Sequence, residues 1–248
     1  MYQFFIQGCQ ATAHEVIITG DDVNHIKNVL RMKQGDVIAV IDQESGTEYR
    51  CEIDTFVEGE VKCKLLFVKE DGIELPSRVY LFQGLPKNDK MELIIQKAVE
   101  LGVYKIIPLA TKRAVVKLDA KKEASKLARW NAISEAAAKQ SKRRIVPEVT
   151  SVMTIREAVA YCENFEVKLI PYELANQKAM ADTKQIIDHL QPGQSIAILI
   201  GPEGGFEESE VEQAAAVGFR PITLGRRILR TETAGFTVLA WIMYHLER

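Results

Sequence analysis

Several features that mark whole classes of protein are missing from this chain of 248 residues. No apolar run approaches the roughly 18 residues that a membrane-spanning helix needs. The N-terminus has no basic segment followed by a long apolar one, so no secretory signal is expected. The four cysteines form no Cys-x-x-Cys pair and the four histidines are dispersed. We therefore expect no metal site, and reduced thiols in a cytoplasmic protein.

The motifs that hold nucleotide phosphates are missing as well. The chain has neither a glycine-rich loop closed by Lys-Ser or Lys-Thr nor a Gly-x-Gly-x-x-Gly fingerprint. These absences disfavour a nucleotide-dependent enzyme.

Positive charge is present, but it is concentrated in one part of the chain. The formal net charge is only −2, yet residues 112–144 hold eleven Lys or Arg and three acidic residues. A local excess of this size attracts a polyanion and favours nucleic acid as a partner. The plainer alternative is the solvated face of a helix.

Two kinds of local pattern divide the chain into two predicted domains, 1–72 and 73–248. Short β-branched and aromatic runs at 2–6, 15–19, 36–41, 48–56 and 61–67, with one helix at 22–32, predict a small β-barrel. After a linker at 70–77, strands at 78–83, 103–109, 166–171, 196–200 and 221–224 alternate with helices at 89–101, 121–142, 183–190, 207–217 and 233–246. This alternation predicts an α/β fold, a parallel sheet with helices on both faces.

A glycine-rich loop follows the apolar strand 196–200. Gly201-Pro202 breaks the strand, and Gly204-Gly205 precede the next helix. Glycines let a ligand approach the backbone closely, at the edge of the sheet where α/β proteins bind ligands. Glu203 suits an uncharged or cationic ligand. The alternative is a tight turn whose glycines serve geometry alone.

A second loop follows the last predicted strand, within residues 224–234. Arg226, Arg227 and Arg230 suit a phosphate or an electron-rich base. Thr231 and Thr233 are natural helix N-caps. The helix that follows is apolar around most of its circumference, which predicts burial in a core or against a second subunit.

These two loops resemble the signature loops of the SPOUT methyltransferases. The matching stretches read Ile-Gly-Pro-Glu-Gly-Gly-Phe at 200–206 and Leu-Gly-x-Arg-Ile-Leu-Arg-x-Glu-Thr-Ala at 224–234. Within that superfamily the chain resembles the family that methylates N3 of a uridine in 16S ribosomal RNA. Weaker matches extend the resemblance over the whole chain: His25-x-x-x-Val29-Leu30-Arg31 with Gly35-Asp36, Lys87-x-x-Lys90-Met91-Glu92, Gln96-Lys97-x-x-Glu100-Leu101-Gly102, and Gln140-Ser141-x-Arg143 with Val146-Pro147. Lys139 departs from the pattern, which has an acid there.

The resemblance implies an N-terminal PUA-like RNA-binding barrel, a SPOUT domain with a C-terminal trefoil knot, a homodimer, and S-adenosylmethionine bound in the knot. The cofactor-binding residues that it implies are Tyr172, Leu199, Ile200, Gly201, Pro202, Glu203, Gly204, Gly205, Leu224, Gly225, Ile228, Leu229 and Arg230. The implied RNA contacts are Arg31, Lys87, Arg113, Arg143 and Arg144, on the 16S rRNA of the small ribosomal subunit.

Methylation of a ring N–H requires a proton to leave, so a base and a charge-stabilising group are expected near the donor. Glu203 and Glu232 are the candidate bases, and Arg230 is the candidate for stabilising the developing uridinate. An ion pair with a neighbouring arginine is an equally good explanation for Glu232. Two other functions stay open: methylation of another RNA such as tRNA, and RNA binding without catalysis during ribosome assembly.

Overall fold

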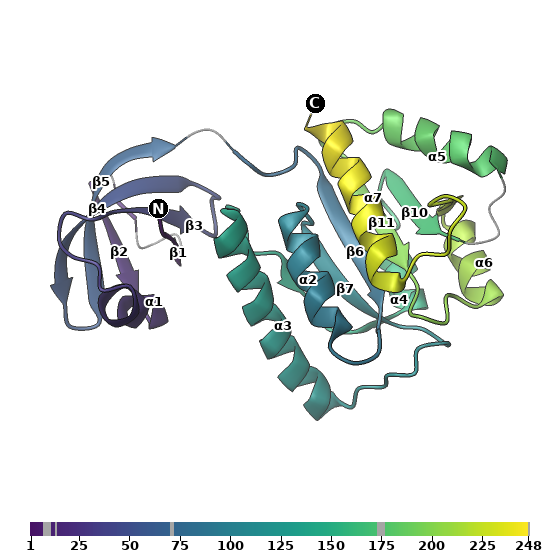
Figure 1. Cartoon of the computed structure of the whole chain (residues 1–248), viewed down its shortest axis with the longest axis horizontal. Helices are drawn as coiled ribbons and strands as arrows, with labels where there is room; N and C mark the ends of the chain where they lie inside the picture. The colour runs from purple at the N-terminus through teal and green to yellow at the C-terminus, as the bar shows by residue number, and fades with distance from the viewer. Residues whose placement is uncertain (7–10, 13, 70–71, 173–176, 248) are drawn as a thin grey trace. The chain divides into compact units, whose positions relative to one another are not determined.

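The computed structural model describes the chain except residues 7–10, 13, 70–71, 173–176 and 248 (Figure 1). It contains two compact units. Unit 1 comprises Met1–Glu74 and Ala138–Val146, and unit 2 comprises Leu75–Ala137 and Pro147–Arg248. The predicted division at 72/73 did not include Ala138–Val146 in the N-terminal unit. The composition of a linker shows where one unit ends, but it does not show that a later segment belongs to the same unit.

Unit 1 is a curled five-stranded sheet with a short helical segment (Figure 1). Its strands are β1 (Gln3–Ile6), β2 (Glu15–Thr19), β3 (Val37–Asp42), β4 (Glu48–Val57) and β5 (Glu60–Lys69), in the order β1-β3-β4-β5-β2. Among the described strand pairs of unit 1, β1–β3 is parallel and the other three are antiparallel. Phe4, Ile18, Ile26, Ile38 and Ile53 are buried together, because alternate side chains of a half-buried strand face one side.

The helical segment of unit 1 is shorter than predicted. The structure has one turn of α-helix, α1 (Asp21–Asn24), followed by a π-helical turn, η2 (His25–Val29). The Leu30 N–H donates to the His25 carbonyl, five residues back. Arg31 then adopts a left-handed φ of 53°, which ends the helical segment.

The segment that returns to unit 1 corrects two predicted RNA contacts. Arg143 and Arg144 are 4% and 8% exposed. Arg143 pairs with Glu74, and Arg144 Nε lies 3.2 Å from Glu48 Oε2. Their guanidinium groups therefore join parts of unit 1, and their burial and ion pairs leave them less available to phosphates than the prediction assumed. Counting charges along the sequence could not reveal their acidic partners, which are about 70 to 100 positions away.

Lys139, the departure from the family pattern, lies in the same segment and makes an ion pair there. Its ammonium is 3.0 Å from Asp22 Oδ1 and lies over the Phe5 ring, 5.9 Å from the ring centroid. The lysine thus stabilises unit 1 by attaching the end of a helix to α1.

Unit 2 contains a seven-stranded parallel sheet. The order is β12-β10-β11-β6-β7-β8, with β9 also paired to β7. The strands are β6 (Arg78–Gly84), β7 (Lys105–Ala110), β8 (Glu148–Val149), β9 (Met153–Thr154), β10 (Val167–Pro171), β11 (Ser195–Ile200) and β12 (Arg220–Ile222). The helices are α2 (Lys90–Glu100), α3 (Ala120–Ser141), whose last turn belongs to unit 1, α4 (Ile155–Tyr161), α5 (Gln177–Asp188), α6 (Glu208–Ala216) and α7 (Thr231–Leu246).

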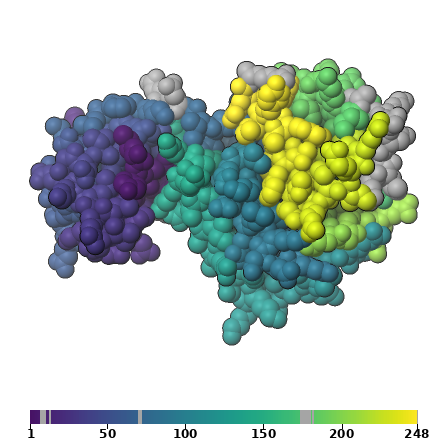
Figure 2. All heavy atoms as spheres, in the orientation of Figure 1, coloured from purple at the N-terminus to yellow at the C-terminus, as the bar shows by residue number. Residues whose placement is uncertain are grey.

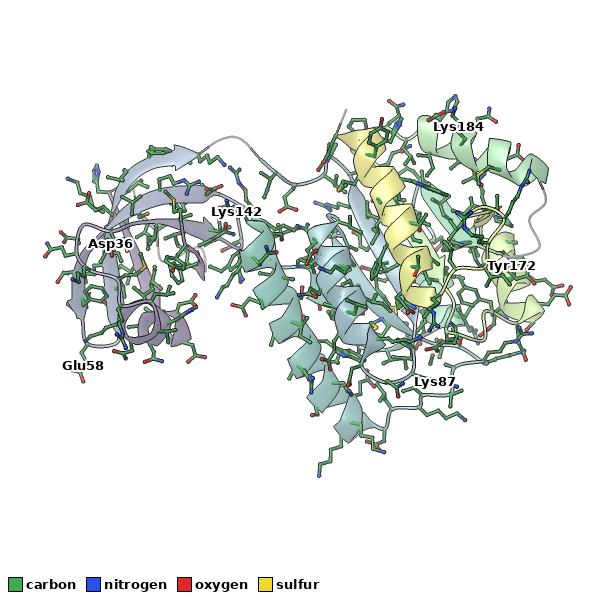
Figure 3. All side chains as sticks on the ribbon, in the orientation of Figure 1. Asp36, Glu58, Lys87, Lys142, Tyr172 and Lys184 are labelled. Atoms are coloured by element: carbon green, nitrogen blue, oxygen red, sulfur yellow. The ribbon has the colours of Figure 1, made fainter. Side chains whose placement is uncertain are left out.

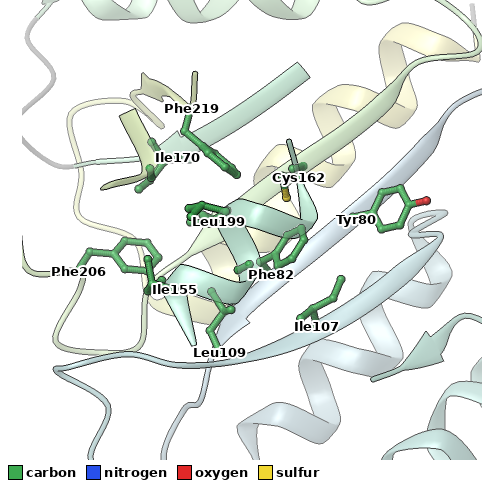
Figure 4. Packing of buried hydrophobic residues seen from close by; sticks show 14 residues of the cluster. Tyr80, Phe82, Ile107, Leu109, Ile155, Cys162, Ile170, Leu199, Phe206 and Phe219 are labelled. Carbon is green, nitrogen blue, oxygen red and sulfur yellow. The ribbon is translucent and has the colours of Figure 1, made fainter. Parts of the chain in front are cut away.

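Helices cover both faces of this sheet, as predicted. On one face Tyr80, Phe82 and Leu199 pack with residues of α4 and α6 in a single hydrophobic cluster (Figure 4). The other face carries α2 and α7, and Gly235 of α7 lies against Leu81 and Ile200. Because β11 is covered on both faces, all of its residues from Ile196 to Ile200 are apolar.

The end of the chain returns from the edge of the sheet to its middle. Strand β12 is at the edge, yet α7 packs on β11, β6 and α2 (Figure 1). This return is the path that the predicted knot requires, and it brings the N-terminus of α7 to the carboxyl ends of β6 and β11. In the part of the chain that the structure describes, no helix is long and apolar enough to cross a membrane.

Candidate active site

The two loops identified in the sequence meet at the carboxyl edge of the parallel sheet. The first loop, 201–207, follows β11, and the second loop, 223–230, follows β12. The Thr231 hydroxyl donates to the Gly201 carbonyl at 2.6 Å and accepts from Gln83 Nε2 at 2.8 Å. Thr231 and Gln83 are both buried. Two loops that are 30 residues apart in the sequence are thereby joined to each other and to the end of β6.

Glycine is required where these segments touch. A Cβ on Gly84 would lie 2.6 Å from the Pro202 ring and backbone nitrogen. A Cβ on Gly201 would lie 3.0 Å from the Gly205 backbone. The close approach explains Gly84 and Gly201, since neither has a positive φ, whereas Gly205 has a φ of 67° and open space around it, which is the requirement of a turn.

The two candidate bases lie on either side of one ammonium group. Lys90 Nζ is 3.1 Å from Glu203 Oε1 and 3.5 Å from Glu232 Oε2. The prediction that Glu232 pairs with a neighbouring arginine is therefore wrong, because its partner is a lysine 142 positions earlier in the chain. A net charge of −1 remains on the three groups, which suits a cationic ligand.

Glu203 is also held by backbone donors. The Lys87 N–H donates to its two carboxylate oxygens at 3.1 and 3.4 Å. Burial raises the pKa of Glu203, but hydrogen bonds from its own backbone N–H, from Lys90 and from the Lys87 N–H outweigh it, so the pKa lies below its ordinary value. Glu203 is therefore a carboxylate at neutral pH.

The loop after β7 supports the first loop from the other side. Arg113 Nη1 donates to the Gly204 carbonyl at 3.2 Å, and the Lys112 N–H donates to Glu210 Oε1 at 2.9 Å. Glu210, buried in the first turn of α6, also accepts from the Glu207 N–H at 2.9 Å. Arg113 thus contacts the first loop directly while its guanidinium stays exposed.

The second loop leaves its charged and apolar side chains open to solvent. Arg226, Arg227 and Arg230 are exposed, and no ion pair engages them among the described residues. Ile228 is 81% exposed, although its side chain is large and apolar. An apolar ligand surface would remove Ile228 from water.

The remaining predicted site residues differ in their exposure and in the unit to which they belong. Lys87 and Tyr172, labelled in Figure 3, follow β6 and β10, so both lie in unit 2. The Leu199 side chain is fully buried in the sheet's hydrophobic cluster, so only its backbone is available to a ligand. Arg31 is exposed in unit 1.

Three residues of the site were missing from the sequence-based prediction: Gln83, Lys90 and Thr231. Thr231 was interpreted as an N-cap, but Arg230 occupies that position and the Thr231 hydroxyl joins the loops. A lysine at the start of a helix is ordinary in sequence. That Lys90 bridges two carboxylates becomes visible only in the structure, where the start of α2, the first loop and the start of α7 lie close together.

These residues fit S-adenosylmethionine, the group implied by the resemblance. The backbone segments pack too closely for a side chain at Gly84 or Gly201, so backbone groups meet there with no side chain between them. Gln83 Oε1 and Glu232 Oε2 are buried without a hydrogen-bond partner. The net negative Lys90–Glu203–Glu232 group complements a sulfonium, and Ile228 is free to cover an adenine ring.

Comparison with known proteins identifies the same class of protein. A family model for an RNA methyltransferase domain matches residues 73–243, and a model for an RNA methyltransferase PUA domain matches 18–55. The α/β fold with an N-terminal PUA domain, predicted from the sequence, is thereby confirmed.

Relatives that match over nearly the full length narrow the class. The chain is 39% identical to ribosomal RNA small subunit methyltransferase E of Bacillus subtilis, covering 100% of this chain and 98% of that one. The structure of ribosomal RNA small subunit methyltransferase E from Neisseria gonorrhoeae bound to S-adenosyl methionine matches with a TM-score of 0.83 and 31% identity, covering 98% and 97%. A methyltransferase from Legionella pneumophila in complex with the same cofactor matches with a TM-score of 0.82, 31% identity and the same coverage.

The chain therefore belongs to the RNA methyltransferase family of ribosomal RNA small subunit methyltransferase E. This membership confirms the resemblance that the two loops indicated.

Proposed function

We propose that this protein transfers a methyl group from S-adenosylmethionine to N3 of a uridine in 16S rRNA. The single observation that carries the proposal is the junction of the two loops, Thr231 on Gly201, beside Lys90, Glu203 and Glu232. The solved relatives bound to the cofactor support the donor. The curated relatives named for the small ribosomal subunit support the acceptor.

The backbone and side chains of the two loops would hold the donor. The proposed contacts are those implied by the resemblance: Tyr172, the segment 199–205, Leu224, Gly225 and the segment 228–230. When bound, the donor supplies an activated methyl group for in-line displacement. The chain's own contribution is to orient the reactants and to exclude water, which is a large share of catalysis for such a reaction.

Charge develops on the acceptor when the proton leaves N3. Arg230 is exposed at the N-terminus of α7 and has no carboxylate partner among the described residues, so its guanidinium is available for the uracil carbonyl oxygens. Arg230→Ala should therefore lower methyl transfer to 30S subunits by roughly 100-fold. Turnover close to that of the wild type would remove this role.

The proposed RNA contacts are narrowed to lysines and arginines with exposed or half-exposed side chains. Lys87 and Arg113 flank the first loop, and Lys117, Lys121 and Lys126 add exposed or half-exposed charge at the start of α3. Arg31 contributes from unit 1. Binding should weaken steeply with salt, because each phosphate contact releases counterions. An affinity for RNA that does not change with salt would contradict this.

A homodimer is the proposed assembly. Helices α5 and α7 line an apolar groove of about 380 Å³ in unit 2, with Met180, Ile187, Trp241 and Tyr244 in its wall. Tyr244 is 64% exposed, and α7 lies on the surface in Figure 2. A second copy would cover this apolar face. Light scattering of the wild type and of Trp241→Glu tests this: the wild type should be a dimer and the variant a monomer. The proposed location is the cytoplasm, where small ribosomal subunits are found.

The acceptor is tested by offering labelled S-adenosylmethionine with 30S subunits, free 16S rRNA or tRNA. We expect label in the 30S or 16S fraction, and 3-methyluridine after digestion to nucleosides. Label in tRNA would favour the alternative acceptor. A protein that binds RNA but shows no binding of S-adenosylmethionine in calorimetry would favour the alternative of a non-catalytic assembly factor.

A further inference from the structure

Lys90 lies where three segments of the site meet. It is the first residue of α2, directly after the loop that follows β6. Its ammonium reaches Glu203 in the first loop and Glu232 in the first turn of α7, with a side chain that is 25% exposed. One positive charge thus faces two carboxylates, one from the first loop and one from the start of α7.

The two carboxylates have different surroundings. Glu203 accepts from the Lys87 N–H with both oxygens and lies 3.1 Å from Lys90 Nζ. Glu232 Oε2 is buried, and Lys90 is 3.5 Å from it without hydrogen-bond geometry. Among the residues that the structure describes, none donates a hydrogen bond to either oxygen of Glu232.

A proton acceptor needs an available lone pair. Hydrogen bonds to the charged form of Glu203 stabilise its carboxylate and make it a weak base. Glu232 has free lone pairs, and its side chain keeps 15% of its surface exposed. Its position beside Arg230 at the N-terminus of α7 places it next to the group that would hold the uracil oxygens.

We propose that Lys90 is a positioning residue that separates the roles of the two carboxylates: Glu203 holds the first loop, and Glu232 accepts the N3 proton. This assignment rests on the proposed function. The N3–H bond breaks and its proton goes to the Glu232 carboxylate. The nitrogen lone pair forms the new bond to the methyl carbon. The methyl–sulfur bond breaks, and its electron pair stays on sulfur as a neutral thioether.

The experiment compares four variants with the wild type, Lys90→Met, Lys90→Arg, Glu203→Gln and Glu232→Gln. Calorimetry gives the Kd for S-adenosylmethionine, and single-turnover transfer to 30S subunits at saturating donor gives the rate. Lys97→Met is the matched control: it makes the same change on the same helix, where Lys97 pairs with Glu100 at 2.8 Å and contacts neither loop.

Glu232→Gln should lose on the order of 100-fold to 10,000-fold in rate with a nearly unchanged Kd, as loss of a general base does. Glu203→Gln should mainly weaken donor binding, with a much smaller loss of rate. Lys90→Met should lower the rate by about tenfold, and Lys90→Arg should recover most of it because it keeps the positive charge. Lys97→Met should match the wild type.

Two results would overturn the assignment while the proposed function stands. One is a larger loss of rate in Glu203→Gln than in Glu232→Gln. The other is a Lys90→Arg variant that is no faster than Lys90→Met. A wild-type protein that binds the donor but methylates no RNA would overturn the proposed function, and the assignment with it.

Discussion

Replacing Thr231 by valine removes the junction between the two loops while keeping the shape of the side chain. Valine has the same branching but no hydroxyl, so the bonds to the Gly201 carbonyl at 2.6 Å and from Gln83 Nε2 at 2.8 Å are both lost. Gln83 keeps its hydrogen bond to the Gly84 carbonyl. The change therefore tests the junction with little effect on packing.

The magnitude follows from the burial of the partners. Each net hydrogen bond contributes about 1 kcal/mol, and an acceptor or donor left buried adds about 1 kcal/mol to the loss. Gln83 is fully buried, whereas Gly201 is half-buried and its carbonyl can gain a water. We expect the free energy of unfolding of unit 2 to fall by about 2–3 kcal/mol, which corresponds to a Tm lower by roughly 4–12 °C.

Tryptophan fluorescence during urea unfolding measures this effect in unit 2, because Trp130 and Trp241, the two tryptophans of the chain, both belong to that unit. Thr233→Val is the matched control, since Thr233 is exposed and its hydroxyl makes no hydrogen bond in the described structure. A loss below about 0.5 kcal/mol in Thr231→Val, equal to that of the control, would refute the reasoning.

Three further predictions concern a close backbone contact, the buried thiols and a buried ion pair of unit 1. Gly84→Ala should weaken S-adenosylmethionine binding in calorimetry by at least about tenfold, because its Cβ would meet Pro202 at 2.6 Å and displace the first loop; an unchanged Kd would contradict the close packing. Cys51, Cys63 and Cys162 should resist alkylation at pH 8 in the native protein and react after unfolding. Burial raises the pKa of each thiol to about 12 and keeps it protonated. Mass spectrometry of the labelled peptides measures this, and rapid labelling of these three cysteines in the native protein would disprove it. Arg144→Met should lower the free energy of unfolding by about 3 kcal/mol, since it leaves the buried Glu48 without one of its cations; far-UV circular dichroism in urea measures it, and a neutral effect would restore Arg144 as a candidate RNA contact.

The predicted strands and helices agree with the structure where burial imposes a regular pattern of apolar residues. The apolar run 196–200 became β11, because helices cover both faces of that strand, and the helix predicted at 89–101 became α2, which buries Met91, Ile94, Ile95 and Ala98. Helix α4, only seven residues long, was not predicted. It is started by the Thr154–Glu157 capping box.

The sequence indicated the two loops of the candidate site, but not the long-range contacts that join them to other segments. The meeting of the two loops follows from the fold, because loops at the carboxyl ends of parallel strands gather at one edge of a sheet, whereas the roles of Gly201, Glu203, Arg230 and Glu232 stay a prediction. Lys90 pairs with Glu203, which is 113 positions later in the chain, and with Glu232, which is 142 positions later. No local sequence pattern encodes contacts of such long range. Glu92 shows the same limit, because its carboxylate pairs with Arg129, 37 positions later in the chain, at 2.7 Å.

The account depends most on both loops holding one methyl donor. A crystal structure of this protein grown with S-adenosylmethionine tests that directly. It should show the donor in contact with the backbone of both 199–205 and 224–230, with its sulfonium near the Lys90–Glu203–Glu232 group. A donor that contacts only one of these loops, or binds elsewhere on the chain, would contradict it.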